Sequence, residues 1–391
     1  MTPSLRHLRI IRDIGRTGSA ARAASATRLT QPAVTLAVAG LERQVGLRLF
    51  DRRPQGLLPT EAGLRLIERI DRALSVLDTA LADLAPRLVL TATMAQLQAL
   101  VAVVEAESFS EAARRLGVAQ PTVHRAVAQI EGEAGRALFD RTRHGVIAAR
   151  STQRLAVAAR LLQAEMDQAW ADLAEMQGRE VGRIVIGGMP LSRSSLLGPA
   201  LARFRVERPT LRVKVVEGPF RELLLGLRRG EIDFLIGALR PGEVVPDLTQ
   251  EALLEDRMAV VCRPGHPAEK SRTNAGLAGY PWVLPPEGTP GRAAFAALFP
   301  EAPASLVETG SLILMRELLA QSDHLGFISA LQVRPEIALG ALVAVRVPLD
   351  DAPRVIGILT RRGWQPTTAQ GGMLDAVRKV AHDLQDKAGQ R

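Results

Sequence analysis

The chain has 391 residues, is 47% hydrophobic and carries a formal net charge of +9, which is enough material for two or three domains. Its single cysteine, Cys262, excludes a disulfide framework within the chain and favours a reducing compartment. Charged side chains interrupt residues 1–14, and no stretch approaches the roughly 20 apolar residues that span a bilayer. We therefore expect a cytoplasmic protein with no membrane contact.

The positive charge is concentrated at the start of the chain. Residues 1–60 contain ten arginines against three acidic residues, so most of the formal excess lies in the first sixth of the sequence. Basic side chains gain free energy by displacing counterions from phosphates, although charge alone does not identify a nucleic-acid partner. The placement favours double-stranded DNA as a partner of the N-terminal region.

An internal repeat organises the N-terminal half at a constant offset of 89 residues. Gln31-Pro32 recurs as Gln120-Pro121, and Leu41-Glu42 recurs as Ile130-Glu131. The paired alanines, the Leu-Phe-Asp-Arg run and the glycine after it also recur without a gap, as Ala23-Ala24 and Ala112-Ala113, Leu49–Arg52 and Leu138–Arg141, and Gly56 and Gly145. Chance does not give this series, so one structural unit is duplicated.

Each unit has the pattern of three short helices followed by a turn-rich, basic tail. In the second copy Val123, Val127 and Ile130 give the third helix a buried stripe. Gly117 ends the second helix, and Pro121 is tolerated because it lies in the first turn of the third helix. This is the layout of a winged helix-turn-helix. The second helix of that motif, which is the third helix of the unit, enters the major groove of DNA. The alternative is a helical bundle with no role in DNA binding, but the basic tails favour DNA.

The third helix of each copy is named the reading helix below. Arg pairs well with guanine and Gln with adenine, and such groups occur on the second reading helix, whereas residues 36–40 of the first reading helix lack them. The first copy has the stronger positive charge and the second copy has the better base-reading groups, so we expect both copies to touch DNA. The alternative is that one copy is a spacer or a dimer module. The candidate DNA contacts are Thr30, Gln31, Pro32, Thr35, Arg52 and Arg53 in the first copy, and Gln120, Pro121, Thr122, His124, Arg125, Gln129, Arg141 and Arg143 in the second.

These motifs resemble the LysR-type family of bacterial regulators. The family's pattern is matched by Gly18-Ser19, Ala23-Ala24, Thr30–Ala33, Leu41-Glu42, Gly46, Leu49-Phe50, Arg52 and Thr60–Gly63. The resemblance resumes at about Gly182 and so covers nearly the whole chain. It implies a transcription regulator rather than an enzyme, with a periplasmic-binding-protein-like effector domain and assembly as a homodimer or homotetramer. Such regulators usually have one DNA-binding domain, so the second copy is a departure.

A long helical pattern with a heptad-like apolar seam follows each tail. Such a seam needs a partner helix, which is supplied either by a second chain or by the same chain. The resemblance favours a dimer through the second of these linker helices. The seam residues are Ile67, Ile70, Leu74, Leu77, Leu81 and Leu84 in the first helix, and Leu155, Ala159, Leu162, Met166, Ala169, Leu173 and Met176 in the second.

From Arg183 onward, short β-rich runs alternate with amphipathic helices, which predicts a parallel sheet covered by helices. A second block has its own strands and helices, and a last strand returns to the first block. We therefore expect a multidomain chain with two tandem α-rich winged helix-turn-helix domains ahead of an α/β two-lobed effector domain. The expected ranges are helix-turn-helix domains at 1–63 and 91–152, linker helices at 64–90 and 153–180, and an effector domain at 181–388, with one lobe at about 181–264 and 346–388 and the other at about 265–345.

The predicted effector site lies where the first strand of this region runs into a helix. A helix start attracts anions, and an arginine such as Arg193 holds a carboxylate with two hydrogen bonds. The alternative is that one serine of this turn only caps the helix and that Arg193 points to solvent; Ser311 has the same capping alternative. We expect a small, anionic or sugar-like effector and no cofactor or metal. The candidate contacts are Pro190, Ser192, Arg193, Ser194 and Glu217 from one lobe, and Thr289 and Ser311 from the other.

The sequence contains none of the common catalytic motifs. It has no Gly-x-Ser-x-Gly elbow, no phosphate-binding P-loop and no His-Glu-x-x-His pair, and its six histidines are scattered. The alternative to a regulator is therefore a soluble small-molecule-binding protein or an enzyme whose helical N-terminal region does not bind DNA.

Overall fold

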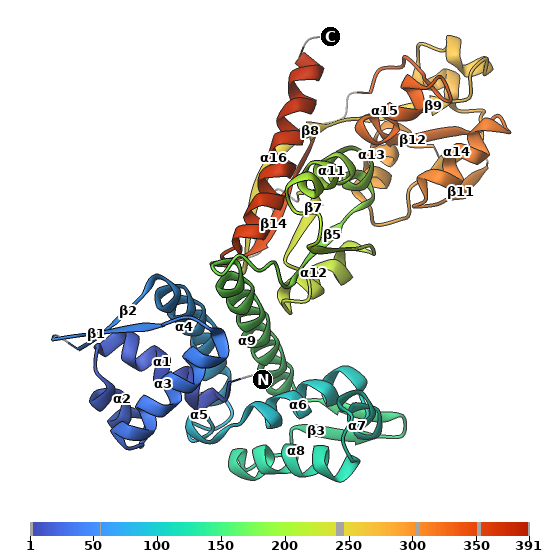
Figure 1. The fold of residues 1–391 in the computed structure, drawn as a ribbon. Coiled ribbons are helices and arrows are strands. Elements are labelled where there is room, and N and C mark those ends of the chain that lie inside the picture. Colours follow the sequence, from blue (N-terminus) through green and yellow to red (C-terminus); the bar gives the residue numbers. More distant parts are fainter. Residues whose placement is uncertain are drawn as a thin grey trace. The chain divides into compact units, whose positions relative to one another are not determined.

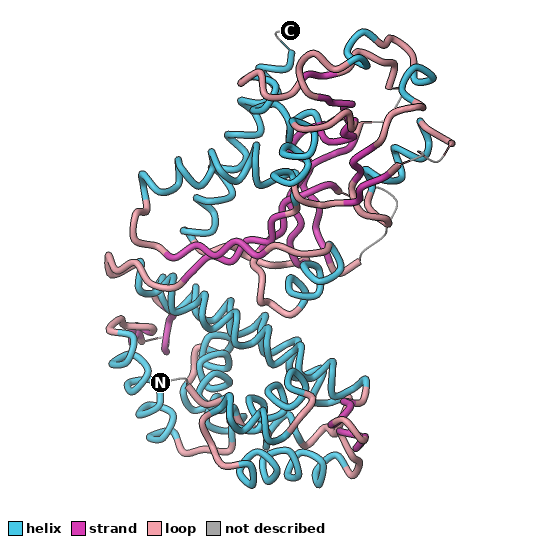
Figure 2. Tube along the Cα trace, turned by 90° about the vertical axis from the view of Figure 1, so that its right-hand side faces the viewer, coloured by secondary structure: helices cyan, strands magenta, loops and turns pink. Residues whose placement is uncertain are grey.

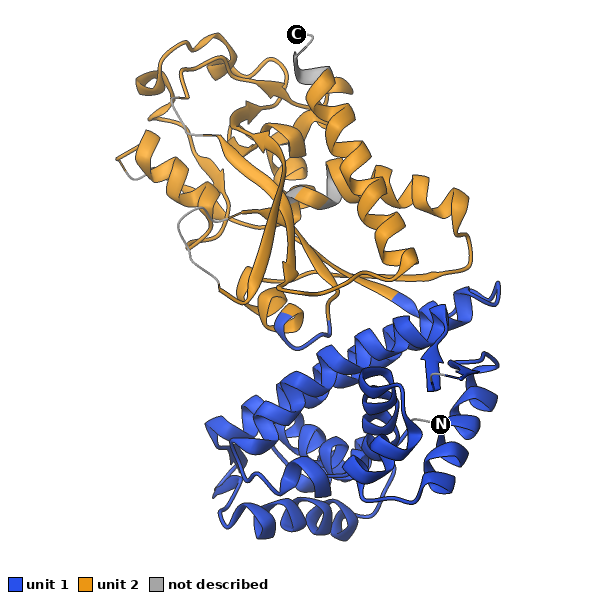
Figure 3. Cartoon of the chain, turned by 90° about the vertical axis from the view of Figure 1, so that its left-hand side faces the viewer, with its two compact units in different colours: residues 1–183, 228–231 blue, residues 184–227, 232–391 orange. Residues whose placement is uncertain are grey.

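The computed structural model describes residues 3–54, 56–239, 246–301, 303, 305–349 and 353–389 (Figure 1). The chain divides into two compact units, one formed by Met1–Arg183 with Arg228–Glu231 and the other by the remaining residues (Figure 3). Helices dominate the first unit, and most of the strands lie in the second (Figure 2). None of the helices in the described ranges has the length and apolar character needed to traverse a bilayer.

The first helix-turn-helix copy consists of three helices, a hairpin and a linker helix. Its helices begin at side-chain caps: Ser4 accepts from the His7 N–H, Ser19 from the Arg22 N–H and Thr30 from the Ala33 N–H. The elements are α1 (Leu5–Thr17), α2 (Ala20–Thr27), α3 (Gln31–Val45), β1 (Phe50–Arg53), β2 (Gly56–Pro59) and α4 (Glu61–Ala82).

The second copy repeats this order after the short helix α5 (Leu88–Thr91). Its first helix starts with a capping box in which Thr93 and Gln96 satisfy each other's backbone N–H groups. Its reading helix starts at Ala119, which supplies no side-chain cap. The elements are α6 (Met94–Ala106), α7 (Phe109–Leu116), α8 (Gln120–Ala134), β3 (Phe139–Thr142), β4 (Gly145–Ala148) and α9 (Arg150–Glu175).

Each hairpin docks on the turn between the first two helices of its own copy. The Leu57 N–H donates to the Gly18 carbonyl at 2.9 Å, and the Val146 N–H donates to the Glu107 carbonyl at the same distance. The residue before each donor is a glycine with positive φ, and a Cβ on Gly56 would lie only 2.3 Å from the Gly18 oxygen. The recurring glycine is therefore required by this close approach.

The two linker helices, α4 and α9, pack on each other within one chain. Their seam residues are buried in a single apolar core that continues through both helix-turn-helix copies, except Ile67 and Met176, which are partly buried against it. The partner of the predicted heptad seam is therefore the other linker helix of the same chain. The expectation that the seam of the second linker helix forms a dimer is wrong, because α4 already covers that seam.

The first lobe of the second unit is built on a five-stranded sheet with the order β6-β5-β7-β14-β8. β5 and β7 are parallel, whereas β14 runs antiparallel to both β7 and β8. The sheet is therefore mixed, contrary to the expected parallel sheet, because β8 leads out of this lobe and β14 returns to it. The elements are β5 (Arg183–Gly188), α10 (Pro190–Ser192), the π-helical turn η1 (Arg193–Leu197), α11 (Gly198–Glu207), β6 (Arg212–Val216), α12 (Phe220–Arg228), β7 (Phe234–Ala238), β8 (Leu248–Asp256), β14 (Arg354–Arg361) and α16 (Thr368–Gly389).

The second lobe has a sheet with the order β11-β10-β12-β9-β13. β9 pairs antiparallel with β12 and β13, so residues 258–262 belong to the second lobe. The expected boundary at about 264, which placed these residues in the first lobe, is wrong. One residue, Arg257, separates β8 from β9, and the change of sheet occurs there. The elements are β9 (Met258–Cys262), η2 (Pro267–Lys270), η3 (Asn274–Leu277), β10 (Trp282–Leu284), α13 (Pro290–Leu298), β11 (Leu306–Glu308), α14 (Leu312–Ala320), β12 (Leu325–Ser329), α15 (Ala330–Ala338) and β13 (Val343–Ala344).

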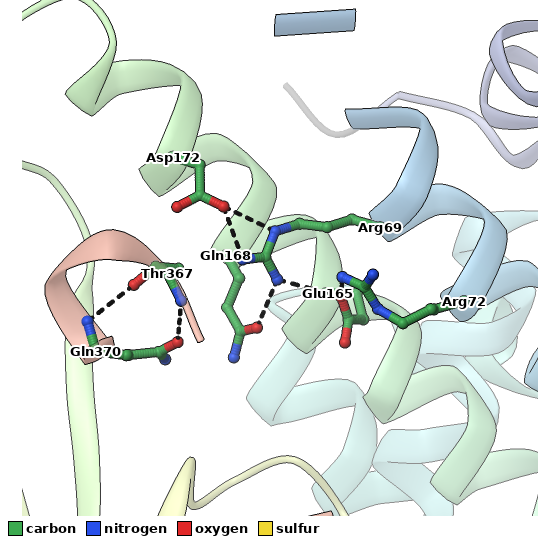
Figure 4. Close-up of polar contacts among 7 residues, drawn as sticks. All are labelled: Arg69, Arg72, Glu165, Gln168, Asp172, Thr367 and Gln370. Carbon is green, nitrogen blue, oxygen red and sulfur yellow. Dashed lines mark hydrogen bonds and ion pairs between the residues drawn. The ribbon is translucent and has the colours of Figure 1, made fainter. Parts of the chain in front are cut away.

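A buried carboxylate holds the junction between the two lobes. Asp256, the last residue of β8, accepts hydrogen bonds from the Ser329 hydroxyl at 2.9 Å and the Leu331 N–H at 3.3 Å, and it pairs with Arg354. These partners come from β12, α15 and β14, so one side chain ties the outgoing strand to the returning strand. The start of α16 is fixed by a second local device, in which Thr367 and Gln370 satisfy each other's N–H groups (Figure 4).

Candidate nucleic-acid interface and effector region

The reading helix of the second copy, α8, has one buried and one exposed face. Val123, Val127 and Ile130 are buried against the other helices of the copy. Thr122, Arg125 and Gln129 are exposed and follow a spacing of three and then four residues, so they share one face. This face presents a hydroxyl, a guanidinium and an amide in one row, which are groups that recognise base edges.

Three of the predicted DNA contacts in this copy, Gln120, His124 and Gln129, make side-chain contacts within their own chain. The Gln129 side-chain oxygen accepts from the Gln96 amide at 2.9 Å, which leaves the Gln129 amide nitrogen on the exposed face. The His124 ring stacks on Phe109 with centroids 4.0 Å apart and planes 7° apart. Its Nε2 lies 3.3 Å from the Gln120 amide nitrogen, and the Gln120 oxygen accepts from the Ser110 hydroxyl at 3.2 Å. His124 therefore supports the packing of α8 on α7. Pro121 is exposed in the first turn of α8, as expected.

The reading helix of the first copy, α3, offers a different surface. Gln31 and Pro32 are exposed at its start, where Thr30 caps the helix. Thr35 is half-buried, and its hydroxyl donates to the Gln31 carbonyl at 3.1 Å. Leu36, 69% exposed, occupies the position that Arg125 occupies in α8. Leu36 was not among the predicted DNA contacts because it offers no hydrogen-bonding group, but an exposed apolar side chain on a reading helix is suited to a thymine methyl group.

The basic tails form the hairpins, and their arginines are exposed. Arg52 and Arg53 lie on β1, while Arg141 lies on β3 and Arg143 lies in the turn after it. In each copy the strand starts at the carboxylate of the repeated Leu/Ile-Glu motif; in the first copy Glu42 accepts from the Leu49 N–H at 2.8 Å. The motif therefore fixes the hairpin relative to the reading helix.

The effector candidates in the first lobe lie at the turn after β5. Ser192 is buried, and its hydroxyl donates to the Met189 carbonyl at 2.8 Å, so it stabilises the turn itself. Pro190 is exposed, and so is Glu217 at the end of β6. The side chains of Arg193 and Ser194 lie outside the described part of the structure. The neighbouring Ser195 donates to the Leu331 carbonyl at 2.5 Å, which links this turn to α15 of the other lobe.

The effector candidates in the second lobe both cap helices. Thr289 accepts from the Arg292 N–H at the start of α13, and Ser311 accepts from the Leu314 N–H at the start of α14. The capping alternative therefore describes Ser311, and Thr289 caps a helix as well. Cys262 is buried in β9, and burial raises the pKa of its thiol to about 11, so the thiol is neutral at physiological pH.

Family models match this chain at both ends. A model described as "Bacterial regulatory helix-turn-helix protein, lysR family" matches residues 5–64 and, separately, residues 94–163. A model described as "LysR substrate binding domain" matches residues 177–381. The two matches of the first model coincide with the two copies of the repeat.

Curated relatives differ in how much of this chain they cover. The HTH-type transcriptional regulator GalR of Pseudomonas putida is 34% identical, and the match covers 97% of each chain. An uncharacterized HTH-type transcriptional regulator of Escherichia coli, YdcI, is 30% identical over 94% of its own length but only 72% of this chain. GalR thus aligns with both copies of the repeat, whereas YdcI leaves about a quarter of this chain unmatched.

Solved structures share the fold at low identity. A full-length OxyR variant from Pseudomonas aeruginosa matches with a TM-score of 0.55 at 20% identity, covering 74% of this chain and 94% of its own. Full-length LysG from Corynebacterium glutamicum, with bound effector Arg, matches with a TM-score of 0.53 at 20% identity, covering 74% of this chain and 97% of its own.

Proposed function

The chain belongs to the LysR family of bacterial transcription regulators, and from this premise we propose which of its surfaces meet DNA and which meet the effector. It is a DNA-binding regulator with an effector-binding domain, and not an enzyme. We place it in the cytoplasm, where its DNA partner lies, and we expect a homodimer or homotetramer.

Both helix-turn-helix copies contact promoter DNA in this proposal. Thr122, Arg125 and Gln129 of α8 meet base edges, and the exposed arginines of the two hairpins meet phosphates. The observation that carries the proposal is the exposed row of hydrogen-bonding groups on α8, in a copy with the same elements as the basic first copy. The start of each reading helix lies at the phosphate backbone of the DNA, where its contacts are made by Gln31 and Pro32 or by Gln120 and Pro121.

A mobility shift with DNA upstream of the protein's own gene and of the neighbouring genes tests this function. We expect a sequence-specific complex whose affinity falls steeply with salt, because arginines displace counterions from phosphates. A scrambled duplex of the same length is the control. The absence of a specific complex, with and without candidate metabolites, would contradict the proposal.

The effector binds between the two lobes in this proposal, at the turn formed by α10 and η1. The link from Ser195 to α15 supports this placement, because it shows that the turn lies at the junction of the lobes. The proposed effector contacts from the first lobe are Pro190, Arg193, Ser194 and Glu217, while Ser192 stabilises the turn. Thr289 and Ser311 act from the second lobe through the helix starts that they cap. LysG, with its bound Arg, is a relative in which a small molecule occupies a full-length regulator.

A thermal-shift screen of small carboxylates and sugars tests the effector site. We expect at least one compound to raise the melting temperature of the wild-type protein and to lose that effect in Arg193→Ala. Arg212→Ala is a control, because Arg212 is exposed on β6. A compound that stabilises wild type and Arg193→Ala equally places its site elsewhere.

A further inference from the structure

The two linker helices are counterparts in the repeat, and they pack against each other in antiparallel fashion. Arg72 of α4 pairs with Glu165 of α9 at 3.1 Å, whereas Asp83, one residue past the end of α4, pairs with Arg154 of α9 at 3.2 Å. As the residue number rises along one helix, the number of its partner falls along the other. The two helices therefore run in opposite directions.

The register of this pairing relates the copies by a two-fold rotation. Between the two ion pairs, Leu74 of α4 comes level with Gln163 of α9, and these positions are 89 residues apart, the offset of the repeat. Equivalent positions thus meet at the centre of the interface. Antiparallel helices that meet at equivalent positions have the arrangement of a two-fold symmetric dimer, in which one patch faces its own copy.

A second pair of contacts follows the same symmetry at the ends of the reading helices. Gln177, just past α9, donates to the carbonyl of Val45 at the end of α3 at 2.6 Å. In the other direction, Arg136, just past α8, donates to the carbonyl of Asp83 at 3.1 Å. The end of each reading helix is therefore held by the end of the linker helix of the other copy.

A buried polar network fixes the interface in one geometry. The Arg69 guanidinium of α4 donates two hydrogen bonds to Asp172, at 2.7 and 2.9 Å, and one to Gln168 at 2.9 Å, and it pairs with Glu165 (Figure 4). The side chains of Arg69 and Asp172 are only 5% and 8% exposed. A buried charge network is satisfied only in its own register, so it disfavours other pairings of the two helices.

We propose that a single chain is an internal pseudo-dimer whose two helix-turn-helix copies read the two halves of one inverted-repeat operator. This inference rests on the proposed function, namely that both copies bind DNA. The duplex has two-fold axes of its own, so two-fold-related readers require half-sites in inverted orientation. The halves differ in sequence, because Arg125 and Gln129 of α8 select guanine and adenine, whereas Leu36 of α3 meets a thymine methyl group.

Counting chains per operator tests the stoichiometry. Hydroxyl-radical footprinting of the full-length protein on its operator gives the number of protected half-sites, and native mass spectrometry gives the number of chains bound. We expect two half-sites per chain, whether or not chains assemble further. One chain per half-site would overturn the inference while leaving the regulatory function intact, whereas no specific binding at all would contradict the proposed function instead.

Grafting the reading face of α8 onto α3 tests the symmetry. In Leu36→Arg with Gly40→Gln, both copies carry the arginine and the glutamine of the reading face, while Thr122 keeps Ala33 as its counterpart. The scaffold accepts the two new side chains because Leu36 is exposed and a Cβ on Gly40 meets nothing within 4 Å. We expect this variant to prefer a perfect inverted repeat of the α8 half-site over the natural operator by about fivefold or more. A preference for a direct repeat, or an unchanged preference, would overturn the two-fold arrangement.

The reciprocal variant, Arg125→Leu with Gln129→Gly, keeps the test decisive if the first graft folds poorly. It removes hydrogen-bonding groups from exposed positions of α8, together with the hydrogen bond that the Gln129 oxygen accepts from Gln96. We expect it to prefer an inverted repeat of the α3 half-site. Circular dichroism of both variants verifies that each is folded before its DNA preference is measured.

Discussion

The reading helices of the two copies share an apolar buried stripe and differ on part of their exposed face. The buried stripe of α3 is Val34, Val38, Leu41 and Val45, and that of α8 is Val123, Val127 and Ile130. On the exposed side, Leu36 and Gly40 stand where α8 has Arg125 and Gln129. The buried stripe keeps the packing of the helix, while the exposed face is free to change what it reads.

The junction between hairpin and linker helix shows that the copies also differ in local structure. In the first copy a Cβ on Gly63 would lie 2.0 Å from the Leu49 carbonyl, so glycine is required there. In the second copy Thr152 occupies that position, and its hydroxyl donates to the Leu138 carbonyl at 2.9 Å. The equivalent carbonyls of Leu49 and Leu138 are thus contacted differently, by close packing against a glycine in the first copy and by a threonine hydroxyl in the second.

The largest expected effect concerns the interface that the copies share. Arg69→Met removes the guanidinium that faces Asp172, and breaking a buried ion pair by removing one partner costs about 3–5 kcal/mol. Its counterpart in the second copy is Ala158, so the network is present on one side of the pseudo-symmetric interface only. Urea denaturation followed by helical circular dichroism measures the loss of unfolding free energy.

Arg65→Met is the matched control for this prediction. Arg65 is one turn earlier on α4 and pairs with Glu61 at a partly exposed position. Exposed pairs contribute about 0–1 kcal/mol, so the control should be nearly neutral. Equal effects of the two substitutions would show that the Arg69 network adds nothing to stability.

The next effect distinguishes a base contact, made by Arg125, from a phosphate contact, made by Arg141. Arg125→Ala should weaken binding by about 5- to 150-fold, the equivalent of about 1–3 kcal/mol, and relax the specificity at one operator position. Arg141→Ala should weaken binding evenly across sequences and reduce the slope of affinity against salt by about one, because it removes a phosphate contact. Competition binding to a set of single-base operator variants distinguishes the two outcomes.

Leu36→Ala sharpens the comparison with the first copy. Loss of the exposed Leu36 side chain should affect the operator at a thymine in the other half-site and leave the position read by Arg125 unchanged. If Arg125→Ala and Leu36→Ala altered the same base pair, the two copies would not be reading separate half-sites.

Local signals in the sequence predicted the helix-turn-helix copies well. Helix ends, paired alanines and the Gln-Pro start are short-range features, and the structure confirms them at Gly117 and the buried Ala112-Ala113 pair. The heptad seams were predicted too, but a seam does not say which helix covers it. The pairing of α4 with α9 depends on contacts between residues about 100 positions apart, such as Arg69 with Asp172.

The effector domain shows the same limit. The sequence predicted that the second block has strands of its own, and β10 and β12 are among those that the structure contains. The direction of β14 and the assignment of β9 to the second lobe were not predicted, because strand partners are set by the crossing of the chain between lobes and not by local pattern. At the effector site, the sequence identified hydroxyl groups but not that Ser192 is buried.

A smaller effect concerns the cap that differs between the copies. Ala119→Thr should give α8 the cap that Thr30 gives α3, where the hydroxyl accepts from the Ala33 N–H at 3.4 Å. The expected gain is about 1 kcal/mol of unfolding free energy. Ala119→Val is a control of matched shape without the hydroxyl, and an equal gain from valine would exclude capping as the cause.

The smallest effect concerns the turn between the second helix and the reading helix. Arg28 ends α2 in the left-handed conformation, with φ of 55°, while its counterpart Gly117 has φ of 66°. The left-handed conformation costs a residue with a side chain about 1–2 kcal/mol, and replacement by glycine removes this cost. The greater freedom of glycine in the unfolded chain lowers the stability by about 0.4–1 kcal/mol, which offsets part of the gain. Arg28→Gly should therefore stabilise the first copy by about 0.5–1 kcal/mol. Gly117→Ala is the reverse experiment, because a Cβ there meets nothing within 4 Å and its cost is conformational alone. If urea denaturation gave both changes the same sign, the strain at Arg28 would not be what separates the two turns.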